Sequence, residues 1–135
     1  GAYQVATNTP ITTRVASEIA SELDFSEYLK KNTTVCSDAS FRMVNRHTGS
    51  NLTYVGKECY NAAQAYVLAR FGADVYTRYY ANALIAASFH EDGHYSEIDK
   101  DRPNYYYHFH LGANKYSKTG GHIFYGKTPS GLMPQ

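Results

Sequence analysis

The chain has 135 residues, of which 43% are hydrophobic, and this favours one folded domain with a modest core. The net charge of +1 at pH 7 excludes a strongly acidic or basic chain, and no apolar run of 18 residues is present to cross a membrane. Residues 100–135 nevertheless contain five basic side chains and one acidic one. The C-terminal part is therefore the basic part, which suits an anionic substrate.

The chain is expected to begin with an arm and a helix. Residues 1–10 are polar and rich in threonine, so we interpret them as an arm or linker, followed by a single α+β domain over residues 11–135. An apolar stripe at helical spacing follows the arm and is formed by Val15, Ile19 and Leu23. This stripe predicts a helix that runs to about Lys31.

The middle of the chain is expected to contain a hairpin and two helices. Residues 40–55 alternate in part around the turn-forming segment 46–50, a pattern typical of a hairpin. Residues 59–70 are rich in good helix formers, so a helix is predicted there. After a break at Gly72, Asp74 is expected to cap a second helix that continues to Phe89.

The sequence His90-Glu91-Asp92-Gly93-His94 matches the zinc-protease motif H-E-x-x-H. That motif needs both histidines on one face of a helix. Asp-Gly is a turn dipeptide with poor helix propensity, and here it follows an apolar helix. We therefore interpret this segment as the end of a helix.

The C-terminal part carries the densest set of reactive side chains. Residues 104–126 contain two β-prone runs separated by the turn-rich segment GANKYSKTGG, a pattern typical of a hairpin with a long loop. Side chains at i and i+2 of a strand share one face, so His108 and His110 are expected to point the same way. Pairing of the two runs would bring His122 close to them. Three imidazoles, which titrate near neutral pH, predict a functional site on this hairpin.

Paired histidines favour metal-independent cleavage of RNA by its own 2′-hydroxyl. One imidazole would take the 2′ proton and another would protonate the leaving 5′ oxygen, while a cation or backbone amides stabilise the phosphorane. We expect His110, His122 and Lys118 to be catalytic. The residues expected to bind substrate are His108, Lys115, the base-stacking tyrosines Tyr105, Tyr107 and Tyr125, and the amides of Gly120 and Gly121.

Two segments of this hairpin resemble a known family. His110-Leu111-Gly112 followed by Lys118-Thr119-Gly120-Gly121-His122 resembles the two-histidine core of EndoU-type ribonucleases, over about 20 of the 135 residues. The ending GGHIFYG resembles C-terminal toxin domains of bacterial polymorphic toxin systems. The resemblance implies a helical part ahead of a small antiparallel sheet, and a secreted toxin that cleaves RNA in the cytoplasm of a target cell. It also implies a cognate immunity protein as a partner.

A papain-like cysteine hydrolase is the first alternative. Cys59 stands where a helix is predicted to begin, and a helix N-terminus favours the thiolate form of cysteine. His122, on a later strand, would complete a Cys–His pair. A disulfide between Cys36 and Cys59, or a buried structural thiol, is equally compatible with the sequence.

A zinc site is the second alternative, because His108, His110 and His122 have a ligand spacing that a sheet can hold. No metal is expected in the preferred interpretation, since only tyrosines, Asp101 and Asn104 lie near in sequence to orient metal ligands. A binding module with a tyrosine-rich surface is the non-enzymatic alternative. The fold expected in every case is α+β, with N-terminal and central helices packed on a small antiparallel sheet whose last hairpin carries the site.

Overall fold

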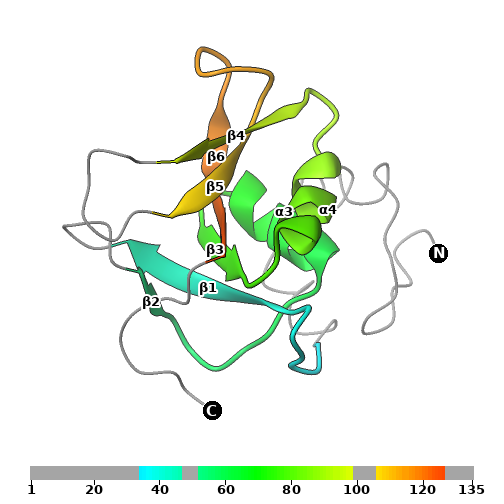
Figure 1. Cartoon of the computed structure of the whole chain (residues 1–135), viewed down its shortest axis with the longest axis vertical. Helices are drawn as coiled ribbons and strands as arrows, with labels where there is room; N and C mark the ends of the chain where they lie inside the picture. Colours follow the sequence, from blue (N-terminus) through cyan, green and yellow to red (C-terminus); the bar gives the residue numbers. More distant parts are fainter. Residues whose placement is uncertain (1–33, 47–51, 99–105, 127–135) are drawn as a thin grey trace.

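The computed structural model describes residues 34–46, 52–98 and 106–126. It contains one six-stranded sheet and two helices, which confirms the expected α+β class (Figure 1). The predicted N-terminal helix and most of the predicted turn at residues 46–50 lie outside the described residues. None of the helices in the described part of the chain is long and apolar enough to cross a membrane.

The first two strands form the hairpin that the sequence predicts. Strand β1 (Phe41–Arg46) pairs antiparallel with β2 (Leu52–Tyr54), so that Val44 lies opposite Tyr54. Helix α3 (Ala62–Arg70) follows, slightly later than the predicted start. Its first turn is held by a capping box, in which the Asn61 side chain accepts a hydrogen bond from the Gln64 amide and the Gln64 side chain accepts one from the Asn61 amide.

The predicted helix from Asp74 to Phe89 is wrong in its first part. Asp74 does not cap a helix, because Asp74–Thr77 is strand β3, and helix α4 begins only at Tyr80 and ends at Ser88. Val, Tyr and Thr are strand-favouring residues, and this short run is paired on both sides, with β1 and with β6. Pairing within the sheet thus determines the structure of residues 74–77, which helical periodicity alone assigns to the following helix.

Strands β4 (His94–Ile98), β5 (Tyr107–Leu111) and β6 (Thr119–Tyr125) complete the sheet in the order β2-β1-β3-β6-β5-β4. The predicted C-terminal hairpin is confirmed as the antiparallel β5–β6 pair. The pairing of β3 with β6 is parallel, so the sheet is mixed, whereas an antiparallel sheet was predicted. The segment after α4 is a turn leading into β4, as expected for Asp92-Gly93, with Gly93 at a φ of 98°.

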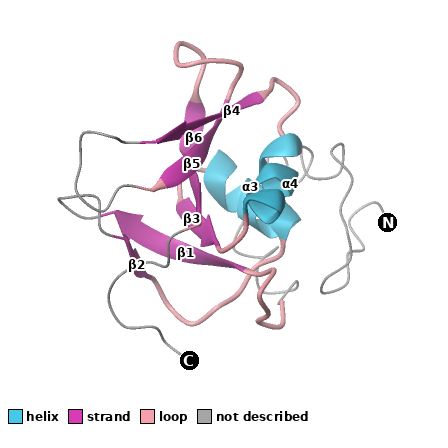
Figure 2. Ribbon diagram, viewed as in Figure 1, coloured by secondary structure: helices cyan, strands magenta, loops and turns pink. Residues whose placement is uncertain are grey.

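The two faces of the sheet differ. Helices α3 and α4 pack on one face, which Figure 2 shows as a cyan layer beside the magenta strands. The main core forms between these layers from Phe41, Val75, Phe109, Leu111 and Ile123 of the strands and Tyr66, Leu68 and several alanines of the helices. A second apolar cluster, made of Val44, Leu52, Tyr76, Tyr106 and Phe124, belongs to the opposite face. Neither described helix covers this second face, which we call the open face.

Candidate functional site

The predicted histidines meet on the open face, in a row that crosses four strands. His110 of β5 lies directly opposite His122 of β6 and opposite Tyr95 of β4. Val75 of β3 lies opposite Ile123, so Asp74 comes beside His122 in the same row. The row therefore reads Asp74, His122, His110, Tyr95, with the ring of Tyr95 stacked on that of His110 at 5.1 Å.

His108 lies in the neighbouring row and completes the cluster. Its ring centroid is 4.7 Å from that of His110 and 5.1 Å from that of His122, as expected for strand residues that share a face. The Nε2 atoms of His108 and His110 are 3.1 Å apart. His108 is 1% exposed and His110 5%, whereas the side chain of His122 is 23% exposed. Solvent or a ligand therefore reaches the cluster mainly from the side of His122.

Asp74 fixes the ring of His122. The Asp74 carboxylate lies 2.8 Å from His122 Nδ1 and also accepts a 2.9 Å hydrogen bond from the His122 backbone amide. Burial by itself would raise the pKa of Asp74, but the hydrogen bonds and charge of His122, with a contribution from Arg46, outweigh it and lower the pKa below its ordinary value. Asp74 is thus a carboxylate that holds the Nδ1 proton of His122 and leaves Nε2 available.

The same arrangement recurs at His108, with a backbone carbonyl in place of the carboxylate. His108 Nδ1 lies 3.3 Å from the carbonyl oxygen of Tyr106, so this nitrogen is the donor and Nε2, which faces His110, is the acceptor. One ring nitrogen from each of the three histidines lies within 4.8 Å of those of the other two. The cluster therefore offers three converging nitrogens, and two of its rings are oriented by hydrogen bonds on their far side.

The two lysines predicted to serve the site lie on the exposed loop between β5 and β6. The Lys115 ammonium stands 5.1 Å from the centre of the Tyr116 ring, and Lys118 is exposed just before β6 begins. Arg46 is the cation whose charge acts on Asp74. The structure thus gives no described contact between either lysine and the histidine cluster, while it places an arginine within electrostatic reach of Asp74.

The predicted tyrosines do not join the histidines. Tyr105 lies outside the described residues. Tyr107 and Tyr125 stack on each other at 5.8 Å, and Tyr125 packs against Phe109 and the main core, so both belong to the helix-covered face. Because side chains alternate along a strand, odd-numbered residues of β5 and β6 point away from the histidines. The expectation that these two tyrosines line the same site is corrected accordingly.

Close packing, and not ligand binding, explains why positions 120 and 121 are glycines. A Cβ atom at Gly121 would overlap the carbonyl group of Ala73, and one at Gly120 would overlap that of Ala69 at the end of α3. Gly120 also has a φ of 74°, which other residues rarely adopt. These glycines allow β6 to approach the α3–β3 connection closely, so the predicted role of their amides as a phosphate cradle receives no support.

Cys59 is not a free thiol, since it forms a disulfide with Cys36. It also precedes the cap of α3 by two residues and so is not the first residue of the helix. The predicted Cys59–His122 pair is therefore not formed. The sequence left the pairing of the two cysteines open, and the structure resolves it in favour of the disulfide.

Asp74 and Tyr95 are the site residues that the sequence analysis missed. Asp74 was assigned to a helix cap because an aspartate before an apolar run is a common helix start. The signal for a strand was the short β-prone run Val75–Thr77 directly after the turn at Gly72, which has a φ of 100°. Tyr95 was missed because β4 was not predicted, although residues 94–98 follow an Asp-Gly turn.

Comparison with known proteins gives no relative for this chain: no family model, no curated protein and no solved structure matches it.

Proposed function

We propose that His108, His110 and His122 bind one zinc ion and that the protein is a zinc-dependent hydrolase acting on RNA. The observation that carries this proposal is the convergence of three ring nitrogens within 4.8 Å, with Nδ1 of His108 and of His122 already hydrogen-bonded to oxygen. Metal-binding histidines usually donate their other ring N–H to a carboxylate or a backbone carbonyl. Asp74 and the Tyr106 carbonyl supply both kinds of partner.

The distances favour a metal over two independent imidazole catalysts. Zinc–nitrogen bonds of about 2.0–2.1 Å at tetrahedral angles put ligand nitrogens about 3.3 Å apart. The 3.1 Å between Nε2 of His108 and Nε2 of His110 is close to that value. Cleavage without metal needs an acid and a base on opposite sides of the phosphate, each within about 2.6–3.2 Å of its own oxygen. Rings packed this closely, with His110 buried, leave little room for that arrangement.

A site with three histidine ligands leaves a fourth zinc position for water. Zinc lowers the pKa of bound water and polarises a phosphoryl oxygen, which is the chemistry that hydrolysis needs. His122 is the most exposed of the three ligands, so the open position is expected on its side. The choice of RNA rests on the resemblance of the hairpin to RNA-cleaving toxin domains. The disulfide, a bond typical of oxidising compartments, supports a secreted setting.

A metal-independent ribonuclease is the second candidate, and the Asp74–His122 pair favours it specifically. A carboxylate bound to Nδ1 fixes the tautomer of a histidine and stabilises its charged form, as in hydrolases that use histidine as a general base. In this mechanism His122 would take the 2′ proton and His110, which shares a short contact with His108, would supply the acid. The secreted toxin and its immunity protein remain predictions under both candidates.

Elemental analysis of the purified, tag-free protein tests the first candidate. We expect one zinc per chain, and loss of zinc in His108→Gln and His110→Gln. Asp74→Asn should weaken zinc binding by about 10–100-fold, measured by competition with a chromophoric chelator. His94→Gln is the matched control, because the His94 ring packs on Phe109 on the other face of the sheet and its loss should leave zinc binding unchanged.

Cleavage of labelled RNA then separates the two candidates. The zinc enzyme should lose activity in EDTA and regain it with added zinc. Activity that survives EDTA but is lost in His122→Ala supports the metal-independent mechanism. A protein that binds no zinc and whose RNA cleavage is indifferent to His110→Ala and His122→Ala contradicts both.

A further inference from the structure

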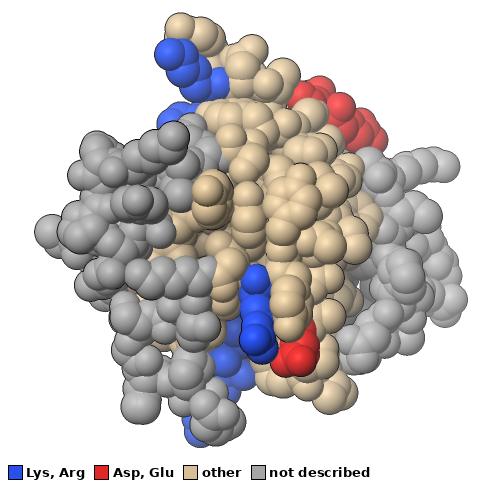
Figure 3. Space-filling model, in the orientation of Figure 1, with Lys and Arg blue, Asp and Glu red and all other residues tan. Residues whose placement is uncertain are grey.

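A second feature of the open face is a basic pocket at the opposite end of the sheet from β4. It has a volume of about 260 Å³ and is lined by Arg42, Lys57, Arg78, Tyr54, Tyr76 and the Cys36–Cys59 disulfide, together with Ser37, Asp38 and Ser40. Three cations and one carboxylate line it, so it is positively charged. In Figure 3 the basic side chains on the visible side lie at two ends of the molecule, over the β5–β6 loop and towards β1.

Arg42 is held in this pocket with unused hydrogen-bonding capacity. Its Nη2 donates a 2.7 Å hydrogen bond to the Gly56 carbonyl, and its guanidinium carbon lies 4.5 Å from the centre of the Tyr54 ring. Its Nε is buried and has no hydrogen-bond partner among the described residues. Within that same part of the chain no carboxylate forms an ion pair with Arg42. A buried donor without a partner is costly, and a bound anion would satisfy it.

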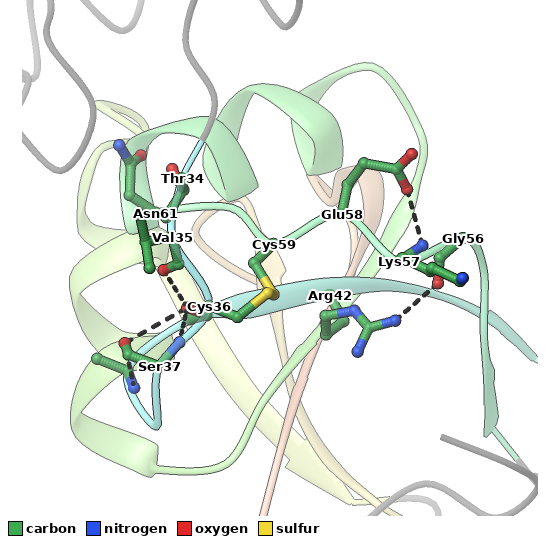
Figure 4. The surroundings of a disulfide bond; sticks show 12 residues. Thr34, Val35, Cys36, Ser37, Arg42, Gly56, Lys57, Glu58, Cys59 and Asn61 are labelled. Carbon is green, nitrogen blue, oxygen red and sulfur yellow. Dashed lines mark hydrogen bonds between the residues drawn. A yellow bond between two sulfur atoms is a disulfide. The ribbon is translucent and has the colours of Figure 1, made fainter. Parts of the chain in front are cut away.

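The disulfide builds the wall of the pocket. It joins the segment that contains Ser37 to the segment that contains Lys57, and Figure 4 shows Arg42 lying beside this cross-link with its guanidinium directed towards Gly56. The Tyr76 hydroxyl donates a 2.9 Å hydrogen bond to the Gly126 carbonyl, and its ring packs edge-on against Tyr54 at 6.2 Å. The surroundings of Arg42 are therefore held by covalent and hydrogen bonds, which lowers the ordering cost of binding an anion there.

The pocket and the histidine cluster lie along one continuous row of side chains. Arg42 lies opposite Tyr76, Tyr76 opposite Phe124, and Phe124 opposite His108. Neighbouring strands are about 4.8 Å apart, so Tyr76 on β3 and His108 on β5 are separated by about 10 Å. One extended oligonucleotide can reach across that distance from the pocket to the cluster.

We propose that this pocket is a phosphate-binding subsite for the backbone of the RNA substrate, a short way along the strand from the bond that is cleaved. The identification of its ligand as RNA rests on the proposed function. Guanidinium and ammonium groups are the usual partners of backbone phosphates, and such contacts hold a strand in register without reading its sequence. Arg42 supplies an oriented donor, while Lys57 and Arg78 add charge at the exposed rim.

Fluorescence anisotropy with a labelled single-stranded RNA, in EDTA and with the disulfide intact, tests the subsite apart from zinc chemistry. Lys57→Gln should raise Kd roughly 3–10-fold and reduce the slope of log K against log salt by about 0.7. Arg42→Gln should raise Kd by roughly tenfold or more. Arg70→Gln is the matched control, because Arg70 is exposed at the end of α3 on the helix-covered side, and it should bind like the wild type. Lys57 is exposed, so its variant stays informative even if Arg42→Gln unfolds.

The two proposals fail in distinguishable ways. An unchanged Kd and salt slope in Lys57→Gln, or an equal loss of affinity in Arg70→Gln, overturns the subsite while leaving zinc binding and cleavage as they were. Loss of RNA binding in the pocket variants, with no zinc bound to the wild type, overturns the zinc centre and retains the subsite.

Discussion

At the scale of single residues, histidine side chains have different roles on the two faces of the sheet. His108, His110 and His122 converge on the open face with oriented rings. His90 instead packs beside α3, with Nδ1 3.4 Å from the Tyr66 hydroxyl and its ring 6.1 Å from the Tyr66 ring. His90 follows the C-terminal end of α4 and is not part of the metal-ligating cluster found among the described residues.

His90 should make stability depend on pH. Burial lowers its pKa, as do Arg70 and His94, and these effects outweigh Asp92 and Glu91, which raise it. The unfolded chain therefore binds a proton that the folded protein resists, so stability is full above the ordinary histidine pKa of about 6.5 and falls as the pH drops below it.

Urea unfolding in EDTA at pH 7.5 and at pH 5.5 measures this effect. The loss of stability between the two values should be smaller in His90→Gln than in the wild type, by at most about 1.4 kcal/mol per pH unit, the limit for one proton. Equal losses in the two proteins would show that His90 titrates alike in the folded and unfolded states.

At the scale of elements, β3 organises the site, although it has only four residues. It pairs with β1 on one side and β6 on the other, which places Asp74 beside His122 and joins the row of the basic pocket to that of the histidines. β6 reaches β3 only because Gly120 and Gly121 let it pass close to the carbonyl groups of Ala69 and Ala73.

Gly121→Ala should therefore destabilise the protein by roughly 3 kcal/mol, since the added Cβ overlaps backbone that cannot move aside as a side chain can. Gly72→Ala is the control, because its Cβ would meet nothing within 4 Å and only its φ of 100° would be strained. It should cost about 1–2 kcal/mol. The midpoint of urea unfolding gives the order, and a larger loss in Gly72→Ala would contradict this account of β6.

At the scale of the whole molecule, the described chain has one face stabilised by helices and one face that carries polar chemistry. The helix-covered face contains the main core, while the open face combines a small apolar cluster with histidines, Asp74 and the basic pocket. The Cys36–Cys59 disulfide ties the segment before β1 to the segment before α3 at the edge of this face. The disulfide thus has two effects, because it stabilises the fold and also shapes the pocket.

Removal of the disulfide should lower the free energy of unfolding by about 3 kcal/mol, the loop-closure value for cysteines 23 residues apart. Urea unfolding of the Cys36→Ser/Cys59→Ser variant measures it, and wild-type protein in a phosphine reductant should agree with the variant. A reduced protein as stable as the oxidised one would show that the cross-link does not contribute to the free energy of unfolding.

The sequence by itself determined the α+β class, the two hairpins, the helix after Asn61 and the shared face of His108 and His110, because each depends on local periodicity or turn chemistry. Only the tertiary structure decided that β3 and β4 are strands, that Tyr107 and Tyr125 face the helices, and that Asp74 meets His122 across 48 residues of chain. Strand pairing between distant segments brings these groups together, and no local pattern encodes the register of a parallel pair such as β3 and β6. Local patterns therefore indicated the hairpins and helix α3, whereas β3, β4, the parallel pair and the oriented site depended on the pairing of the whole sheet.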